Sequence, residues 1–384
     1  MSETIEQETA RSLPLDEKHR QSGAVLEERE GWLVPASYGE SEAEYACVRE
    51  GGAGLVDLSL RGRISVYGSE AVMFLNGLMT NDVKTLAEGS WMPAVFPNVQ
   101  GRLLASARVI HEGKRFLIDT ESVTRAQVFK LLERFNLAGD FRALDITEET
   151  AQLSLQGARS TEVLGLVLDR KDSLPERQEV FSTSWRGVDL ALIRATHTGE
   201  DGFDLFIEAS GAQSLWEALV AAGAHPFGQD ALEVMRLEAG VPRFKVDMDE
   251  TTVVLETGLE EAVSFTKGCY IGQEIIARIH WRGHVAKKLT GLSFENRTEV
   301  PREARIGTLD GKEIGRVTSS TFSPRLNRTI ALGYVKYDYL APGTELRVLF
   351  GDEEQSVHVT ALPFVRGSWH ASSSELKRAD EQAG

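Results

Sequence analysis

The pattern of apolar and polar positions predicts alternating strands and helices over the first part of the chain. Apolar residues alternate at 63–67, 91–96 and 103–110, which is typical of half-buried strands. The segment Asn98-Val99-Gln100-Gly101 separates the last two and indicates a hairpin. The segment 122–135 instead repeats its apolar residues at helical spacing. Together these segments predict one αβ unit.

A second αβ pattern follows the first. Strand-like and helical runs alternate again, and a glycine-flanked turn, Thr198-Gly199-Glu200-Asp201-Gly202, precedes one of the strands. The predicted strands are 153–155, 188–193 and 203–207, and the predicted helices are 215–220 and 231–239.

Helical signals disappear between 285 and 365. Short strand-like runs, separated by Gly, Pro, Asn and Asp, take their place at 289–294, 313–321, 330–335, 346–350 and 357–362. Several short strands at this spacing predict a small closed or sandwich-like β domain. The predicted order along the chain is therefore αβ, αβ and all-β.

Composition narrows the possible functions. The 384 residues allow two or three domains, and 42% hydrophobic content supports buried cores. No apolar run approaches the roughly 20 residues that cross a bilayer, so no membrane partner is expected. A net charge of −16 argues against broad nucleic-acid binding, which requires basic surface. The acidic N-terminus lacks the features of a targeting signal, which predicts a cytoplasmic protein. Residues 1–30 and 367–384 are polar and are predicted to be flexible tails.

The chain has only two cysteines, Cys47 and Cys269, in different contexts. They suggest no disulfide framework, and without a Cys-x-x-Cys pair the chain supplies no metal or iron–sulfur site of its own. Cys269 stands between two glycines, two residues after Lys267. Nearby positive charge or a helix N-terminus favours thiolate over thiol, and the residues after Glu274 could open either a helix or a strand. The alternative is that Cys269 fills a gap in the core as a small apolar residue.

One basic cluster directly follows this cysteine segment. In an acidic chain it is either a solvated face or a subsite for an anionic ligand. Its members are Arg278, His280, Arg282, His284, Lys287 and Lys288.

The run Lys267-Gly268-Cys269-Tyr270-Ile271-Gly272-Gln273-Glu274 resembles the signature of the YgfZ family of folate-binding proteins. That family is implicated in maintaining or assembling iron–sulfur clusters. It is related to the T-protein, the aminomethyltransferase of the glycine cleavage system. The resemblance extends from about residue 32 to residue 366. Further segments similar to the T-protein superfamily are 56–59, 80–83, 155–157, 198–203, 236–240 and 318–324.

The resemblance implies an α+β fold built as a three-domain ring, like a cloverleaf around a central folate-binding hole. Two related αβ domains would be followed by a C-terminal β-barrel at 285–366. The first αβ domain would be discontinuous, formed by 31–60 together with 150–284. The second αβ domain, 61–149, would be inserted into it.

The resemblance also implies how the ligand, tetrahydrofolate or a one-carbon derivative of it, is held. Glu200 matches a carboxylate that holds the pterin ring, since a carboxylate can accept two parallel N–H bonds. Without the resemblance, Glu200 would be read as a surface turn residue. Cys269 would be a reactive thiol near the hole, kept as thiolate with the help of Lys267. The other candidate binding residues are Arg236, Asn98, Gly268, Tyr270, Gly272, Gln273, Glu274 and Arg278, and no metal ligand is expected.

Two departures from the T-protein pattern concern catalysis and folate positioning. The acid/base carboxylate of that enzyme lies in a segment resembling Asn-x-x-Gly-Gly-Ile-x-Asp-Asp. Here Ala105 and Ser106 stand where the acidic pair would be, and neither can exchange a proton as a carboxylate does. Asp119 replaces an asparagine that helps to position folate. The loss of the acidic pair predicts a folate pocket without the transfer acid and argues against an active aminomethyltransferase, while it leaves open whether the chain is an enzyme of another kind.

Three functions follow from these observations. The leading hypothesis is a tetrahydrofolate-binding accessory protein that supports iron–sulfur cluster assembly or repair. Its partners would be reduced folate and iron–sulfur enzymes or cluster-assembly proteins. The alternative is a folate-dependent aminomethyltransferase or other one-carbon transferase of the T-protein type. A third is an interaction protein whose folate pocket is vestigial.

Overall fold

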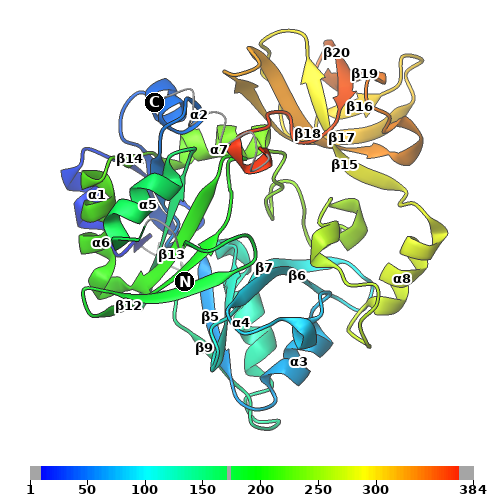
Figure 1. Ribbon diagram of the computed structural model, residues 1–384. Helices are drawn as coiled ribbons and strands as arrows, with labels where there is room; N and C mark the ends of the chain where they lie inside the picture. The colour runs from blue at the N-terminus through cyan, green and yellow to red at the C-terminus, as the bar shows by residue number, and fades with distance from the viewer. Residues whose placement is uncertain (1–9, 171–173, 372–384) are drawn as a thin grey trace, which may run out of the picture.

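The computed structural model describes residues 10–170 and 174–371. Two αβ lobes and a β-barrel are arranged around a common centre (Figure 1). This confirms the predicted fold class of two αβ domains and a C-terminal barrel.

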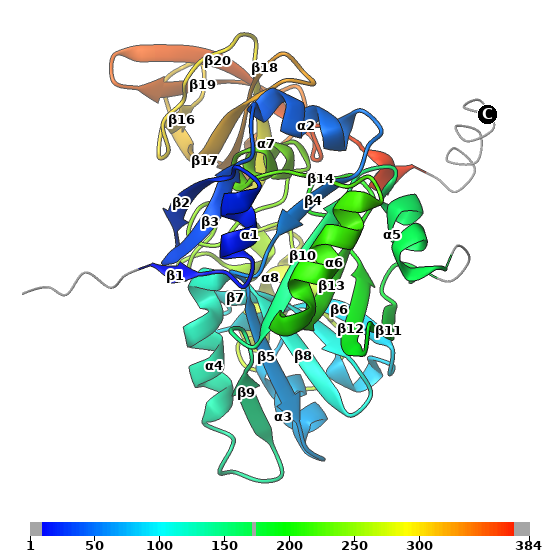
Figure 2. The ribbon, with the colours of Figure 1, turned by 90° about the vertical axis from the view of Figure 1, so that its left-hand side faces the viewer.

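The first αβ lobe is built on a six-stranded sheet with strand order β11-β12-β13-β10-β4-β14. The chain leaves this sheet after β4 and returns to it at β10, because these two strands are antiparallel neighbours. Helix α6 lies across one face of the sheet, and Trp216 is among its fully buried side chains (Figure 2). The strands are β4 (Gly54–Asp57), β10 (Thr150–Gln156), β11 (Val180–Trp185), β12 (Val188–Arg194), β13 (Gly202–Glu208) and β14 (His225–Pro226). The helices are α2 (Ser41–Arg49), α5 (Ser160–Leu168), α6 (Ala209–Ala221) and α7 (Gln229–Glu238).

The second αβ lobe lies between β4 and β10 in the chain. Its sheet has the order β6-β7-β8-β5-β9, and every neighbouring pair is antiparallel. The strands are β5 (Gly62–Tyr67), β6 (Ser90–Pro97), β7 (Leu103–His111), β8 (Arg115–Thr120) and β9 (Arg142–Asp145). The helical elements are α3 (Ala71–Leu78), η1 (Val83–Thr85), η2 (Ser122–Thr124) and α4 (Arg125–Glu133).

The barrel closes in the order β15-β18-β17-β16-β19-β20. Its interior is filled by small and branched apolar side chains, among them Ile306, Val317 and Val348. The strands are β15 (Lys287–Phe294), β16 (Arg305–Gly307), β17 (Glu313–Ser323), β18 (Arg328–Lys336), β19 (Glu345–Phe350) and β20 (Glu353–Thr360), with η5 at Tyr337–Tyr339. A helical connection of η3 (Val254–Glu256), η4 (Glu260–Ala262) and α8 (Gln273–Arg282) joins α7 to the barrel.

The predicted N-terminal tail is wrong for residues 10–30. They form β1 (Arg11–Ser12), α1 (Asp16–Gln21) and β2 (Val25–Arg29), and pair with β3 (Trp32–Ser37) in a three-stranded sheet. The reason is a buried contact with the first lobe: His19 Nε2 lies 2.8 Å from Asp57 Oδ2, and Tyr38 Oη lies 2.7 Å from His19 Nδ1. Leu15 is also fully buried. Residues 1–9 of the predicted tail lie outside the described residues.

The C-terminal tail prediction also fails where it can be compared. Residues 367–371 pack against the first lobe and contain a short helix, η6 (Ser368–His370), whereas 372–384 lie outside the described residues. Across the described ranges no helix combines the length and apolar character needed to cross a membrane.

Candidate functional site

Glu200 sits in a tight turn between β12 and β13, and both of its carboxylate oxygens are occupied. Gly199 enables the turn with φ +81°. Arg49 of α2 donates from Nη1 to Glu200 Oε1 at 2.9 Å. Ser368 donates both its backbone N–H and its hydroxyl to Oε2, each at 2.7 Å. Glu200 is only 6% exposed, so it is a buried carboxylate with both oxygens hydrogen-bonded and not a surface turn residue.

Behind Glu200 lies a second buried carboxylate, Glu238 of α7. Arg49 donates to it from Nε at 2.9 Å, which links the two acids through one guanidinium. Tyr45 and Ser323 donate their hydroxyls to the same carboxylate at 2.8 and 2.5 Å. Burial, followed by the charge of Glu238, raises the pKa of Tyr45, so its hydroxyl stays a donor. The Glu200 side chain is therefore held directly by α2 and the C-terminal segment. Through Arg49 it is linked to Glu238 of α7, which Ser323 of the barrel contacts in turn.

A second cluster of polar side chains surrounds Ser106 on β7. Ala105, its neighbour, faces the core of the second lobe and is fully buried. Ser106 points the other way and donates its hydroxyl to Glu121 Oε1 at 3.2 Å. The same carboxylate accepts the backbone N–H of Phe244, with N–O distances of 3.2 and 3.0 Å.

The environment of Glu121 disfavours its ionised form. Burial raises the pKa of Glu121, and the nearby Glu30 adds to that effect. Arg61, the Phe244 N–H and the Ser106 hydroxyl act in the opposite direction, but the net shift is upward. A carboxylic acid with a raised pKa is the group that general acid–base chemistry needs. The sequence interpretation missed this residue, although its place directly after the strand that carries Asp119 was a usable signal.

Next to this cluster, Arg108 joins the two αβ lobes. Its guanidinium lies 2.5 Å from Asp119 of the same sheet and 2.6 Å from Asp204 of the first lobe. Arg61 pairs with Asp119 at 2.8 Å, and His197 contacts Asp204 at 2.9 Å. Burial opposes ionisation of both aspartates, but their neighbours outweigh it and lower their pKa values. These neighbours are Arg108 and Arg61 for Asp119, and His197 and Arg108 for Asp204.

The Cys269 segment lies elsewhere, against the second lobe. The Cys269 thiol is exposed. The Lys267 ammonium group is buried and donates to three backbone carbonyls, and its role in holding the thiolate stays a prediction. These are the carbonyls of Asn76, Met79 and Asn81, at 2.7, 2.9 and 2.6 Å.

Glycine and hairpin contacts shape this segment. Gly272 caps α8 with φ +78°, and a Cβ there would lie 2.3 Å from the Asn98 carbonyl oxygen. The Asn98 side chain accepts the N–H groups of Gln100 and Arg102 at 2.8 and 3.1 Å, so it stabilises its own hairpin. Tyr270 is buried in the neighbouring apolar cluster.

The remaining predicted binding residues are engaged in structural contacts. Gln273 reaches the carbonyls of Lys267 and Gly268 only at 3.4 Å. Glu274 and Arg278 form an exposed ion pair at 3.1 Å on α8.

Arg236 is buried on α7 and pairs with Glu233 and, at 2.5 Å, with Asp247. These contacts make Arg236 a cross-link between α7 and the segment that follows it.

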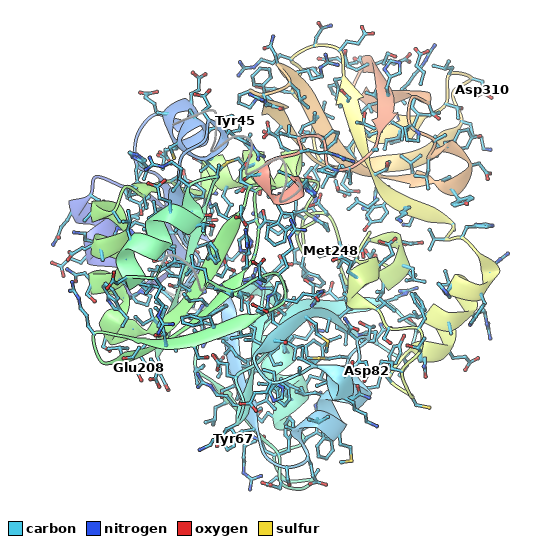
Figure 3. All side chains as sticks on the ribbon, in the orientation of Figure 1. Tyr45, Tyr67, Asp82, Glu208, Met248 and Asp310 are labelled. Atoms are coloured by element: carbon cyan, nitrogen blue, oxygen red, sulfur yellow. The ribbon has the colours of Figure 1, made fainter. Side chains whose placement is uncertain are left out.

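The Glu200 cluster and the Cys269 segment lie on different lobes. Tyr45 and Asp82, both labelled in Figure 3, mark the two places: Tyr45 contacts Glu238, and Asp82 caps η1 beside the carbonyls that bind Lys267. Helix α8 projects at the outer edge of the molecule (Figure 1). Among the described residues no group of three His, Cys, Asp or Glu side chains is arranged to hold a metal ion.

Two domain families match this architecture. The GCVT N-terminal domain matches residues 15–267, and the glycine cleavage T-protein C-terminal barrel domain matches residues 287–366. The chain belongs to the glycine cleavage T-protein family. This confirms the wider resemblance predicted from the sequence, whereas the YgfZ assignment is narrower than the family and stays a prediction.

Individual relatives in the T-protein family cover nearly the whole chain. An aminomethyltransferase of Rubrobacter xylanophilus is 35% identical and covers 93% of this chain and 95% of its own length. One of Thermotoga neapolitana is 32% identical, with 92% and 98% coverage. The crystal structure of the glycine cleavage system aminomethyltransferase T from Bartonella henselae superimposes with a TM-score of 0.86 at 26% identity. It covers 93% of this chain and 98% of that one.

Proposed function

We propose that this protein binds a reduced folate and transfers a one-carbon unit to or from it, as an aminomethyltransferase-type enzyme. The observation that carries the proposal is the Glu121 carboxylate beside Ser106. The sequence predicted that the transfer acid was lost at Ala105 and Ser106. The fold instead brings a carboxyl group to that place from the end of β8.

The two acids suit two different tasks. Glu200 is buried next to Arg49, and its carboxylate oxygens can accept the paired N–H donors of a pterin edge. Glu121 has a raised pKa, so it holds a proton more readily than an ordinary glutamate does. After it donates that proton, the Phe244 N–H and the Ser106 hydroxyl stabilise the carboxylate. In this proposal Glu200 binds the ligand and Glu121 exchanges the proton, each in its own buried environment.

The direct test is incubation with tetrahydrofolate and an aminomethylated lipoyl carrier protein, with methylenetetrahydrofolate formation as the readout. Glu121→Gln keeps the hydrogen-bond acceptor but cannot exchange the proton, so we expect a rate loss of about 10²- to 10⁴-fold. The dissociation constant for tetrahydrofolate and the urea unfolding midpoint should stay close to wild type. Glu133→Gln, an exposed position on α4, is the matched control. An inactive wild-type protein would overturn the proposal.

A second candidate function is the folate-binding accessory role in iron–sulfur cluster assembly or repair. The exposed thiol of Cys269 favours it, since a reactive cysteine must be reachable. One cysteine cannot hold a cluster alone, so this role requires ligands from iron–sulfur enzymes or cluster-assembly proteins. A cytoplasmic location would suit both functions and stays a prediction from the sequence.

Cys269→Ala separates the two functions. The accessory role predicts that this variant fails to restore cluster-enzyme activity in a deletion strain. The one-carbon proposal predicts unchanged transfer by the same variant. Cys47→Ala is the matched control, because burial raises the pKa of Cys47 to about 12 and keeps that thiol unreactive.

A further inference from the structure

The C-terminal segment 365–371, the C-terminal strap, crosses the turn that carries Glu200. Val365 N donates to Glu238 O at 3.0 Å, and Trp369 N donates to Gly199 O at 3.2 Å. Asp201 N donates to the Ser368 hydroxyl oxygen at 2.8 Å. The strap is therefore hydrogen-bonded to the residues immediately before and after Glu200, which are Gly199 and Asp201.

The centre of the strap is fitted closely to Glu200. Ser368 places two donors on Oε2, while Arg49 occupies Oε1. A Cβ at Gly367 would lie only 2.3 Å from Glu200 Oε1 and 2.5 Å from the Gly199 carbonyl oxygen, so a larger residue there would displace the carboxylate or the strap. A carboxylate offers about four acceptor sites, and three of those on Glu200 are taken. The two on Oε2 are both filled by the strap.

Polar contacts hold most of the strap. Val365 is its one buried residue, whereas Arg366 and His370 are exposed. Trp369 is half-buried, with the Arg177 guanidinium 4.1 Å from its ring centroid, and Arg177 also donates to the Trp369 carbonyl oxygen. Segments with few buried apolar contacts open at low free-energy cost. The strap is thus well placed on Glu200 but weakly anchored to the core.

We propose that the C-terminal strap is a displaceable latch on Glu200: Ser368 occupies the carboxylate in the empty protein, and a ligand with two parallel N–H donors binds only after Ser368 leaves. This inference rests on the proposed folate-binding function. A pterin edge needs one acceptor site on each oxygen, and Oε2 provides one only when the strap opens. The observed affinity is then reduced by the fraction of molecules whose strap is open.

Calorimetric titration with tetrahydrofolate tests the latch. A chain ending at Val365 should bind at least about tenfold more tightly than the full chain, because all of its molecules are open. Deletion of residues 372–384 alone leaves the strap in place and should leave the dissociation constant unchanged. In the full-length protein, Trp369→Ala removes the ring that the Arg177 guanidinium contacts but keeps the main-chain carbonyl to which Arg177 donates, and it should also strengthen binding.

Hydrogen exchange on the unaltered chain provides a second measurement that does not depend on the variants folding. Saturating tetrahydrofolate should accelerate exchange of the Ser368 and Trp369 amides, whose acceptors are Glu200 and Gly199. Binding that is equal or weaker without the strap, or amides that stay protected in the complex, would overturn the latch alone. Absence of tetrahydrofolate binding in every form, with the fold intact, would overturn the folate-binding proposal itself.

Discussion

At the scale of single residues, Lys267 shows how a motif residue can have a structural role. Burial lowers the pKa of Lys267 to about 8, so the side chain is still charged near pH 7. Its ammonium group donates to three backbone carbonyl oxygens, one in the last turn of α3 and two in the residues just after that helix. A buried ammonium is tolerated only when its donors are satisfied, and here the second lobe satisfies them. The lysine therefore ties the Cys269 segment to that lobe.

Replacement of Lys267 by methionine is predicted to destabilise the protein by about 2–4 kcal/mol, because the charged donor shared by three carbonyl oxygens is lost. Urea unfolding at pH 7 measures the change. Lys288→Met serves as control, since Lys288 pairs with Glu260 on the surface and should change stability by less than about 1 kcal/mol. Equal effects of the two substitutions would show that the carbonyl contacts contribute little.

At the scale of elements, the turn into α8 depends on one glycine of the Cys269 motif. Gly272 adopts a left-handed conformation, and its Cα packs against the Asn98–Arg102 hairpin. Ile276, one turn into the helix, is fully buried in the cluster beneath. Gly268 in the same motif has neither constraint, because nothing lies within 4 Å of its would-be Cβ. Only one of the motif's two glycines is thus required by backbone geometry.

Gly272→Ala is accordingly expected to cost more than about 1 kcal/mol of stability, since alanine is strained at positive φ and would clash with the Asn98 carbonyl. Gly268→Ala should change stability by no more than about 0.5 kcal/mol. Thermal unfolding of the two variants in parallel makes the comparison. The interpretation fails if Gly268→Ala is the more damaging change.

At the scale of the whole molecule, a buried charge cluster fastens the two αβ lobes. Arg108 of the second-lobe sheet forms ion pairs with Asp204 of the first-lobe sheet and with Asp119 of its own sheet. Both aspartates are fully buried, so removing one would leave an uncompensated cation between the sheets. The relative placement of Glu121 and Glu200 depends on this junction.

Asp204→Ala is predicted to destabilise the protein by about 3–5 kcal/mol at pH 7. The folded-state pKa of Asp204 lies below the ordinary 3.8, so the stabilisation is present above that pH and is lost as the pH falls below it. The difference between wild type and variant should therefore shrink in acid, as followed by urea titrations at pH 7 and below pH 3.8. Asp189→Ala, exposed on β12, should show neither effect. A difference that is independent of pH would contradict the ion-pair account.

The fold could be anticipated from periodicity where strands and helices carry their own signal. The runs at 63–67, 103–110 and 188–193 all fall within observed strands, β5, β7 and β12. The order of the N-terminal segment could not be anticipated from periodicity, because this segment has few apolar residues of its own. Its order comes from His19 meeting Asp57 across the sequence, a contact that no local pattern contains.

The residues of the candidate site also differ in whether the local sequence reveals them. Glu200 was found because a glycine-rich turn and a family motif surround it in the sequence. Glu121 was missed because its importance comes from Ser106 on another strand and from Phe244, 123 positions later in the chain. The structural contacts of Lys267 were missed because its acceptors are backbone carbonyls, which have no signature in side-chain composition.

The sequence by itself determined the order of αβ, αβ and barrel regions, the turn that carries Glu200 and the glycines of the cysteine motif, because each depends on the conformational preferences of neighbouring residues. The tertiary structure alone decided which groups share a site. It supplied Glu121 next to Ser106, covered Glu200 with Ser368 and turned Lys267 toward α3. The physical reason is that hydrogen bonds and desolvation act between atoms close in space, and folding brings such atoms together across any separation in the chain.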